Sequence, residues 1–195
     1  MTRTQQLPER HPKLIVFDLD YTLWEEWIDS TSGPPFSYDK TKNVIYDRSG
    51  YEMHLFKTTT AIFALIHNSM PNTKIAIASR THTPDWAYAA LKLLRIPELK
   101  MTMHAAIERF EIYPSSKIKH FEALRRKTGI DCSEMIFFDD EWRNNEVRTL
   151  GVHFHHVDSR KGVTMQQFMD ALNKYDRDSR YVQTKLDFSK HTSQQ

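Results

Sequence analysis

The chain has 195 residues, a length that predicts one domain with room for a small insertion. Its composition, 39% hydrophobic and 27% charged, is ordinary for a soluble globular protein with a single apolar core. The formal net charge is only +2, and no apolar run reaches the ~18–20 residues that a membrane span requires, so we expect neither nucleic acid nor membrane among its partners. Residues 1–10 contain no apolar signal core, so we expect an intracellular protein of the cytoplasm and/or nucleus.

The first part of the chain combines a buried strand with an inserted flap. Residues 1–12 are polar and are expected to form a flexible N-terminus. Residues 13–17, Lys-Leu-Ile-Val-Phe, predict a strand that is buried on both faces. Residues 25–56 hold two β-rich runs, at 44–46 and 51–56, on either side of a glycine-containing turn. This pattern predicts a hairpin flap between the first strand and the first long helix.

The rest of the chain alternates helical and strand patterns. Helices are predicted over residues 58–70, 84–94, 116–128, 144–150 and 164–175, and strands over residues 74–78, 135–138 and 152–157. Residues 101–113 are ambiguous, with a short helix and a strand at 111–113 as one interpretation. Residues 176–195 are polar and predict a mobile tail. The alternation predicts a Rossmann-like three-layer α/β/α domain over residues 13–175, with a mainly parallel sheet.

Polar residues follow the three clearest strands, at the sheet edge where such folds bind ligands. They are Asp18 and Asp20 after the first strand, Ser79 and Arg80 after the second, and Asp139 and Asp140 after the third. In extended backbone Asp18 and Asp20 point to the same side. Two such carboxylates repel unless a cation such as Mg²⁺ lies between them or one is protonated. One could then attack phosphorus while the other serves as general acid and base.

The remaining groups could hold a metal ion and a phosphoryl group. Asp139 is the preferred metal ligand, with Asp140 as the second choice or as its support. Ser79 and Arg80 offer donors to phosphoryl oxygens, and Lys117, near a helix start, could balance the negative charge. Each feature alone also fits an ordinary structural role: a polar turn for the carboxylate pairs, a strand-end cap for Ser79, and a surface cation for Lys117.

Taken in order, these motifs resemble the signature of the haloacid dehalogenase superfamily. The matching strings are Asp18-Leu19-Asp20-Tyr21-Thr22, Ser79, Lys117 and Asp139-Asp140, within residues 14–157. With their flanking residues, at 17–24, 78–81, 116–117 and 137–141, the chain more narrowly resembles the magnesium-dependent phosphatase one family. A short flap in place of a large cap agrees with that resemblance.

The resemblance implies a Mg²⁺-dependent phosphomonoester hydrolase that works through an aspartyl-phosphate intermediate. It implies Asp18 as nucleophile and metal ligand, Asp20 as general acid/base and metal ligand, and Asp139 as the third metal ligand. The residues expected around the phosphate are Leu19, Thr22, Ser79, Arg80 and Lys117, of which Lys117 is also expected to be catalytic. The implied substrates are phosphotyrosine or another aryl phosphate, or small sugar phosphates, and a monomer is favoured.

Other interpretations stay open on the sequence alone. A phosphotransferase of the same superfamily, or a catalytically silent phosphate-binding module, would share several of these motifs. Cys132 is expected to be a partly buried small residue, the basic run 125–127 a solvated helix end, and His153 and His155 side chains on one sheet face. Four aromatic residues either line the substrate mouth or pack the flap onto the body: Trp24, Trp27, Tyr46 and Tyr51.

Overall fold

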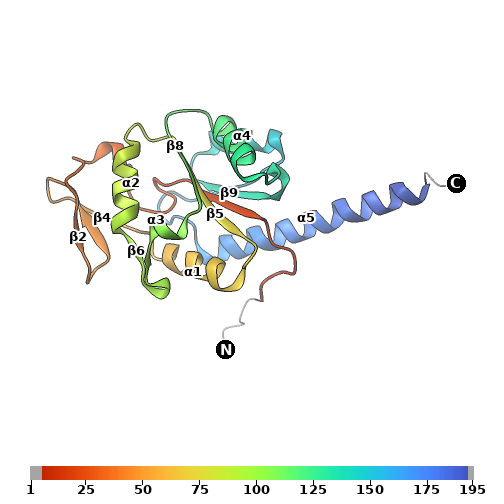
Figure 1. The fold of residues 1–195 in the computed structure, drawn as a ribbon, viewed down its shortest axis with the longest axis horizontal. Coiled ribbons are helices and arrows are strands. Elements are labelled where there is room, and N and C mark those ends of the chain that lie inside the picture. Colours follow the sequence, from red (N-terminus) through yellow and green to blue (C-terminus); the bar gives the residue numbers. More distant parts are fainter. Residues whose placement is uncertain (1–5, 193–195) are drawn as a thin grey trace.

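A parallel five-stranded sheet forms the centre of the molecule (Figure 1). The computed structural model describes residues 6–192, with side chains up to Tyr181. The sheet has the order β10-β9-β1-β5-β8, and every adjacent pair is parallel. The strands are β1 (Leu14–Phe17), β5 (Lys74–Ser79), β8 (Arg109–Ile112), β9 (Met135–Asp139) and β10 (His153–His156). The predicted fold class is therefore confirmed, with β1 at the centre.

Helices cover both faces of this sheet because β1 is apolar on both sides. Ile15 and Phe17 belong to one buried cluster, whereas Leu14 and Val16 belong to another. The first cluster includes residues of α1 (Thr59–Ser69), α2 (Pro84–Leu93) and α5 (Met165–Thr192), and the second includes residues of α4 (Lys117–Thr128). Figure 1 shows α4 on the opposite side of the sheet from α1 and α5.

The flap is a three-stranded antiparallel sheet, so the prediction of a two-stranded hairpin was incomplete. Its strands are β2 (Ser37–Asp39), β3 (Val44–Tyr46) and β4 (Glu52–His54), in that order, preceded by the 3₁₀ turn η1 (Ile28–Ser30). The added strand, Ser-Tyr-Asp, is too short and polar to show an alternating pattern. Its position comes from pairing with β3, where Tyr38 faces Ile45.

The segment between α2 and α4 is resolved into small elements. The pair β6 (Arg95–Ile96) and β7 (Met101–Thr102) encloses the 3₁₀ turn η2 (Pro97–Leu99). The short helix α3 (Met103–Ala106) leads into β8, which begins and ends earlier than the strand expected at 111–113. Two further 3₁₀ segments, η3 (Cys132–Glu134) and η4 (Trp142–Leu150), flank β9. The helix expected over 144–150 is thus a 3₁₀ segment that ends, as predicted, at Gly151.

The final helix is much longer than predicted. The sequence indicated an end at Tyr175 and a tail from residue 176, but α5 continues to Thr192. Neither Gly nor Pro occurs within α5, and the i,i+4 pairs Lys174–Asp178 and Asp176–Arg180 support the helix beyond that point. Figure 1 shows this half of α5 extending away from the sheet. The predictions for residues 1–5 and 193–195 lie outside the described residues.

The described helices include none that is both long enough and apolar enough to span a membrane.

Candidate active site

The three predicted polar groups meet at the carboxyl edge of the sheet. In the ladder Phe17 lies beside Ile77 and Phe138, so the residues that follow β1, β5 and β9 are neighbours in space. A cavity of about 420 Å³ opens at this edge. Its wall includes Asp18, Asp20, Ser79, Arg80, Lys117 and Asp140, together with flap residues. The sheet topology thus brings together motifs that lie up to about 120 residues apart in the chain.

Lys117 provides the positive charge at the centre of this edge. It is the first residue of α4, whose N-cap is Ser116, and its side chain is 1% exposed. Its Nζ lies 2.6 Å from Asp18 Oδ1 and 3.1 Å from Asp139 Oδ2, and it also donates to the carbonyl of Ala78. Lys117 is therefore held by two carboxylates and is not a surface cation. A buried ammonium between two carboxylates compensates part of their negative charge.

These contacts set the protonation states around Lys117. Burial lowers the pKa of Lys117, but the negative charges of Asp139 and Asp18 outweigh it, so the net pKa is raised and the ammonium stays charged. Burial raises the pKa of Asp18 well above its ordinary value, while Lys117 acts in the opposite direction. Asp18 thus sits in a site where one further positive charge would favour its ionised form.

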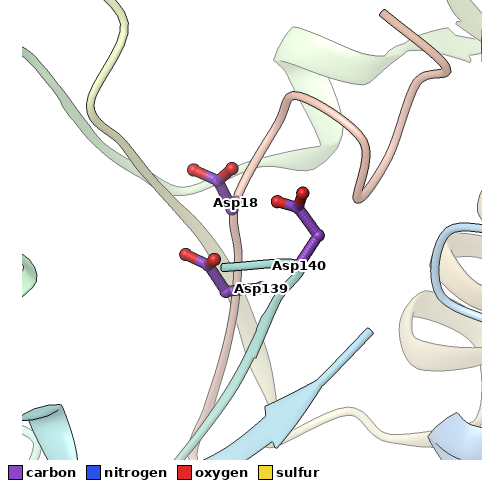
Figure 2. A group of neighbouring side chains, drawn as sticks. All are labelled: Asp18, Asp139 and Asp140. Atoms are coloured by element: carbon purple, nitrogen blue, oxygen red, sulfur yellow. The ribbon is translucent and has the colours of Figure 1, made fainter. Parts of the chain in front are cut away.

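Asp18, Asp139 and Asp140 each place one carboxylate oxygen within 4.8 Å of the others (Figure 2). Figure 2 shows the three side chains grouped where β1 and β9 end. Asp139 is fully buried, and its oxygens accept hydrogen bonds from Glu141 N (2.7 Å) and Asn144 Nδ2 (2.8 Å) in addition to the contact with Lys117. Asp140 is partly exposed and lines the cavity. The geometry therefore favours Asp140, the second choice from sequence, as the more available ligand.

Asp20 is turned toward the flap. Its Oδ1 accepts hydrogen bonds from Trp24 Nε1 (2.7 Å) and from Ile28 N (3.2 Å), and its carboxyl group also lines the cavity. Burial raises the pKa of Asp20 to about 7. A carboxyl group that titrates near neutral pH can both donate and accept a proton, which is what a general acid and base requires.

The loop after β5, which holds the residues expected to bind phosphate, forms one part of the cavity wall. Ser79 is 1% exposed and ends β5, and its Oγ accepts a hydrogen bond from Thr81 N (3.3 Å). Arg80 lines the cavity, and its Nη1 donates to Asn144 Oδ1 (3.3 Å). Asn144 is 1% exposed, and it connects Arg80 with Asp139 because its amide nitrogen donates to Asp139 while its amide oxygen accepts from Arg80.

Two of the residues expected around the phosphate, Leu19 and Thr22, have buried side chains and are not among the residues that line the cavity. Leu19 is fully buried, and its carbonyl accepts hydrogen bonds from the amides of residues 22, 23 and 24. Thr22 is also fully buried, and its carbonyl accepts a hydrogen bond from Val163 N (3.1 Å). Sequence reasoning did not anticipate Asp29, a flap residue that also lines the cavity. No local pattern distinguishes it, because its role depends on where the flap lies.

The structure separates the four aromatic residues that the sequence left open. Trp27 lines the cavity and is 54% exposed. Trp24 is fully buried beneath Asp20, whereas Tyr46 and Tyr51 donate hydrogen bonds to Glu52 and Glu26. Only Trp27 of the four therefore offers a ring to a ligand in this cavity.

The sequence matches the family model described as Acid Phosphatase over residues 10–178. This chain belongs to the acid phosphatase family. The motifs at the strand ends lie within the matched region. The predicted identification as a phosphatase is therefore confirmed.

Curated relatives of this phosphatase come from fungi and animals. A HAD-like hydrolase superfamily protein of Schizosaccharomyces pombe is 42% identical over 147 residues, which is 73% of this chain and 84% of the relative. The human protein named magnesium-dependent phosphatase 1 is 39% identical over 168 residues, which is 85% of this chain and 88% of the relative. Both relatives are thus matched over most of their length, and the predicted membership of the haloacid dehalogenase superfamily is confirmed.

A solved structure shares the fold of the phosphatase. The phosphatase domain of a Bacteroides fragilis protein, crystallised with Mg, superposes with a TM-score of 0.60 at 20% identity. The match covers 85% of this chain and 41% of that chain, so this chain spans less than half of that structure's length. This likeness supports the fold. The cluster of three aspartates in this chain fits a magnesium ion. Hard divalent cations take oxygen ligands, and the carboxylate oxygens of Asp18, Asp139 and Asp140 lie close together.

Proposed function

We propose that this phosphatase is a Mg²⁺-dependent phosphomonoester hydrolase with Asp18 as its nucleophile and an aspartyl-phosphate intermediate. The observation that carries the proposal is the placement of Asp18. Its carboxylate lies 2.6 Å from the buried ammonium of Lys117, in a cavity that also contains the carboxyl group of Asp20. A nucleophile, a fixed cation and a proton donor at one strand edge are the groups that phosphoryl transfer needs.

In the first step, an oxygen of Asp18 forms a bond to phosphorus as the ester P–O bond breaks. Lys117 balances the charge, and Asp20 gives its proton to the leaving alkoxide oxygen. In the second step, Asp20 takes a proton from water, whose oxygen bonds to phosphorus as the Asp18–phosphorus bond breaks. Inorganic phosphate leaves, and both carboxyl groups return to their starting states. A pKa of about 7 suits Asp20 to both halves of this cycle.

Asp18 and Asp140, with Asp139 behind them, are the residues that would hold Mg²⁺. The ion, when bound, supplies positive charge to the phosphoryl oxygens. Ser79 and Arg80 line the same cavity and provide hydrogen-bond donors for the phosphoryl group.

We propose aryl phosphates, including phosphotyrosine, or small sugar phosphates as substrates. The cavity has no large covering domain within residues 6–192, and its flap wall presents the exposed ring of Trp27. An exposed indole beside a phosphate site favours an aromatic leaving group. A sugar phosphate would use the polar groups of the same wall.

The first test is hydrolysis of a generic aryl phosphate by the purified protein, with Mg²⁺ and with EDTA. Asp18→Asn should lower turnover by at least about 10³-fold, because an amide oxygen is a poor nucleophile, while the fold is retained. Asp131→Asn is the matched control, since Asp131 caps the remote segment η3 and should leave turnover unchanged. Appreciable activity in Asp18→Asn would contradict the assignment. Transfer to an added alcohol in place of water would instead identify a phosphotransferase.

A further inference from the structure

A flap residue, Asp29, connects the flap to the loop that follows β5. It lies in η1, lines the active-site cavity, and has a side chain 19% exposed. Its Oδ1 accepts hydrogen bonds from the hydroxyl groups of Thr81 and Thr83, the latter at 2.6 Å. Its Oδ2 accepts a hydrogen bond from His82 N at 3.1 Å. One carboxylate thus binds three consecutive residues of the loop.

A carboxylate in a cavity that binds an anion is unfavourable unless donors compensate its charge. Burial acts to raise the pKa of Asp29, but the hydroxyl groups of Thr81 and Thr83 and the amide of His82 outweigh it, so the pKa is lowered. Asp29 is therefore an ionised group whose two oxygens are already occupied by the loop. This arrangement suits a structural connection better than a contact with an anionic substrate.

The connection continues from Thr81 to the phosphate-binding residues. Thr81 is 3% exposed, and its hydroxyl oxygen also accepts a hydrogen bond from Thr83 N (3.1 Å). Its own amide donates to Ser79 Oγ (3.3 Å). Ser79 and Arg80 are the donors proposed for the phosphoryl group. Fixing the hydroxyl of Thr81 therefore limits how far both of these donors can move.

The same turn is attached to the proposed general acid. Ile28, the neighbour of Asp29 in η1, donates its amide to Asp20 Oδ1 at 3.2 Å. One residue of η1 therefore contacts the acid/base, and the next residue contacts the phosphate loop. The distance between the proton donor and the phosphate donors is set through this turn.

From these contacts, we infer that Asp29 is a positioning residue, which holds the loop of residues 79–83 in register with Asp20. The inference rests on the proposed function. Asp29 acts through Thr81 and Ser79 and takes no part in bond making. Losing it should leave the chemical groups in place but misalign them, and misalignment on the scale of an ångström costs up to about 100-fold in rate.

The test compares Asp29→Ala with Asp39→Ala. Asp39 belongs to the same flap and accepts two backbone hydrogen bonds, from Thr41 N and Lys42 N, in the turn after β2. We expect Asp29→Ala to lower kcat/KM for an aryl phosphate by roughly 10- to 100-fold per folded molecule. It should weaken binding of inorganic phosphate in Mg²⁺ by about tenfold. Asp39→Ala should stay within about twofold of wild type in both, and Asp29→Asn, which keeps an oxygen for the hydroxyl groups, should recover part of the loss.

Hydrogen exchange provides a readout that does not depend on turnover. The amide of His82, which is bonded to Asp29, should exchange faster in Asp29→Ala and not in Asp39→Ala. Unchanged exchange there would overturn the inference, as would faster exchange with unchanged phosphate affinity and unchanged kcat/KM. A wild-type protein that binds phosphate without hydrolysing esters would refute the proposed function, and phosphate affinity and exchange would still decide the role of Asp29.

Discussion

Replacing Lys117 by Met should be among the most damaging single changes in this protein. Met has a similar length but no charge, so the variant leaves Asp18 and Asp139 without their cation. Asp139 is fully buried and Asp18 is only 8% exposed, at the cavity wall, so water can replace the ammonium only in part. Removing one partner of a buried ion pair costs about 3–5 kcal/mol of unfolding free energy, and here one cation serves two carboxylates. We expect a loss at the upper end of that range.

The assay is urea unfolding in EDTA, followed by tryptophan fluorescence, because Trp24 is fully buried. Burial raises the pKa of Asp18, and Lys117 is the group that lowers it, so in Lys117→Met the folded-state pKa of Asp18 should lie still further above that of the unfolded chain. The folded variant then binds a proton that the unfolded chain has lost, so the deficit in unfolding free energy should be larger at pH 8 than at pH 5. Turnover with Mg²⁺ should fall by at least about 100-fold, because Lys117 also balances charge at the nucleophile.

Lys127→Met is the matched control. Lys127 also pairs with a buried carboxylate, Glu111, at 2.7 Å, but it is 49% exposed and remote from the cavity. Its loss should cost no more than about 1–3 kcal/mol and should leave kcat unchanged. If Lys117→Met were as stable as Lys127→Met and kept its activity within about threefold, the account of the buried cation would be refuted.

Three further predictions concern the metal, the packing and the pH dependence. Asp140→Asn should raise the Mg²⁺ concentration required for half-maximal activity by at least about tenfold, because Asp140 is the more available oxygen ligand. Asp139→Asn should chiefly reduce the free energy of unfolding, because Asp139 accepts buried hydrogen bonds. Gly162→Ala should destabilise the fold by roughly 2–4 kcal/mol, because its Cβ would lie 2.1 Å from a ring carbon of Phe56 at a φ of +60°. Burial lowers the pKa of His120 to about 4. Between pH 6.5 and 4 the unfolded chain therefore binds a proton at His120 that the folded chain does not. The free energy of unfolding should fall by about 1.4 kcal/mol per pH unit in this range as the pH drops.

Each of these has a direct check. Magnesium titrations of the two aspartate variants would contradict the ligand choice if Asp139→Asn showed the larger shift. Gly50→Ala is the control for Gly162→Ala, since Gly50 has a φ of +86° but no atom within 4 Å of the added Cβ. Equal losses in the two glycine variants would mean that backbone strain alone is responsible. For His120, unfolding between pH 7 and 5 should show a shallower slope in His120→Gln, and identical slopes would rule out the titration of this side chain.

The sequence determined the sheet and the chemistry at its edge because both are encoded locally. Short apolar runs before Asp18, Ser79 and Asp139 could bury themselves only as central strands, and parallel strands bring their carboxyl ends together. The motif order then predicted which residues serve as nucleophile, phosphate donors and cation, and the structure brings these residues together around one cavity. The flap was also visible, but its third strand was not, since Ser37–Asp39 becomes a strand only by pairing with β3.

The tertiary structure alone decided which side chains face the cavity. The sequence alone does not distinguish Asp139 from Asp140, because both are aspartates at the end of the same strand. Adjacent residues of an extended chain point to opposite sides. Only the packed structure shows that the carboxylate of Asp139 is already bound by Lys117 and Asn144. Asp29 lies in the flap, about 50 residues before the loop that follows β5, yet it accepts hydrogen bonds from that loop, a contact that no periodicity predicts. Propensity and pattern describe a residue's neighbours in the chain, whereas these roles depend on its neighbours in space.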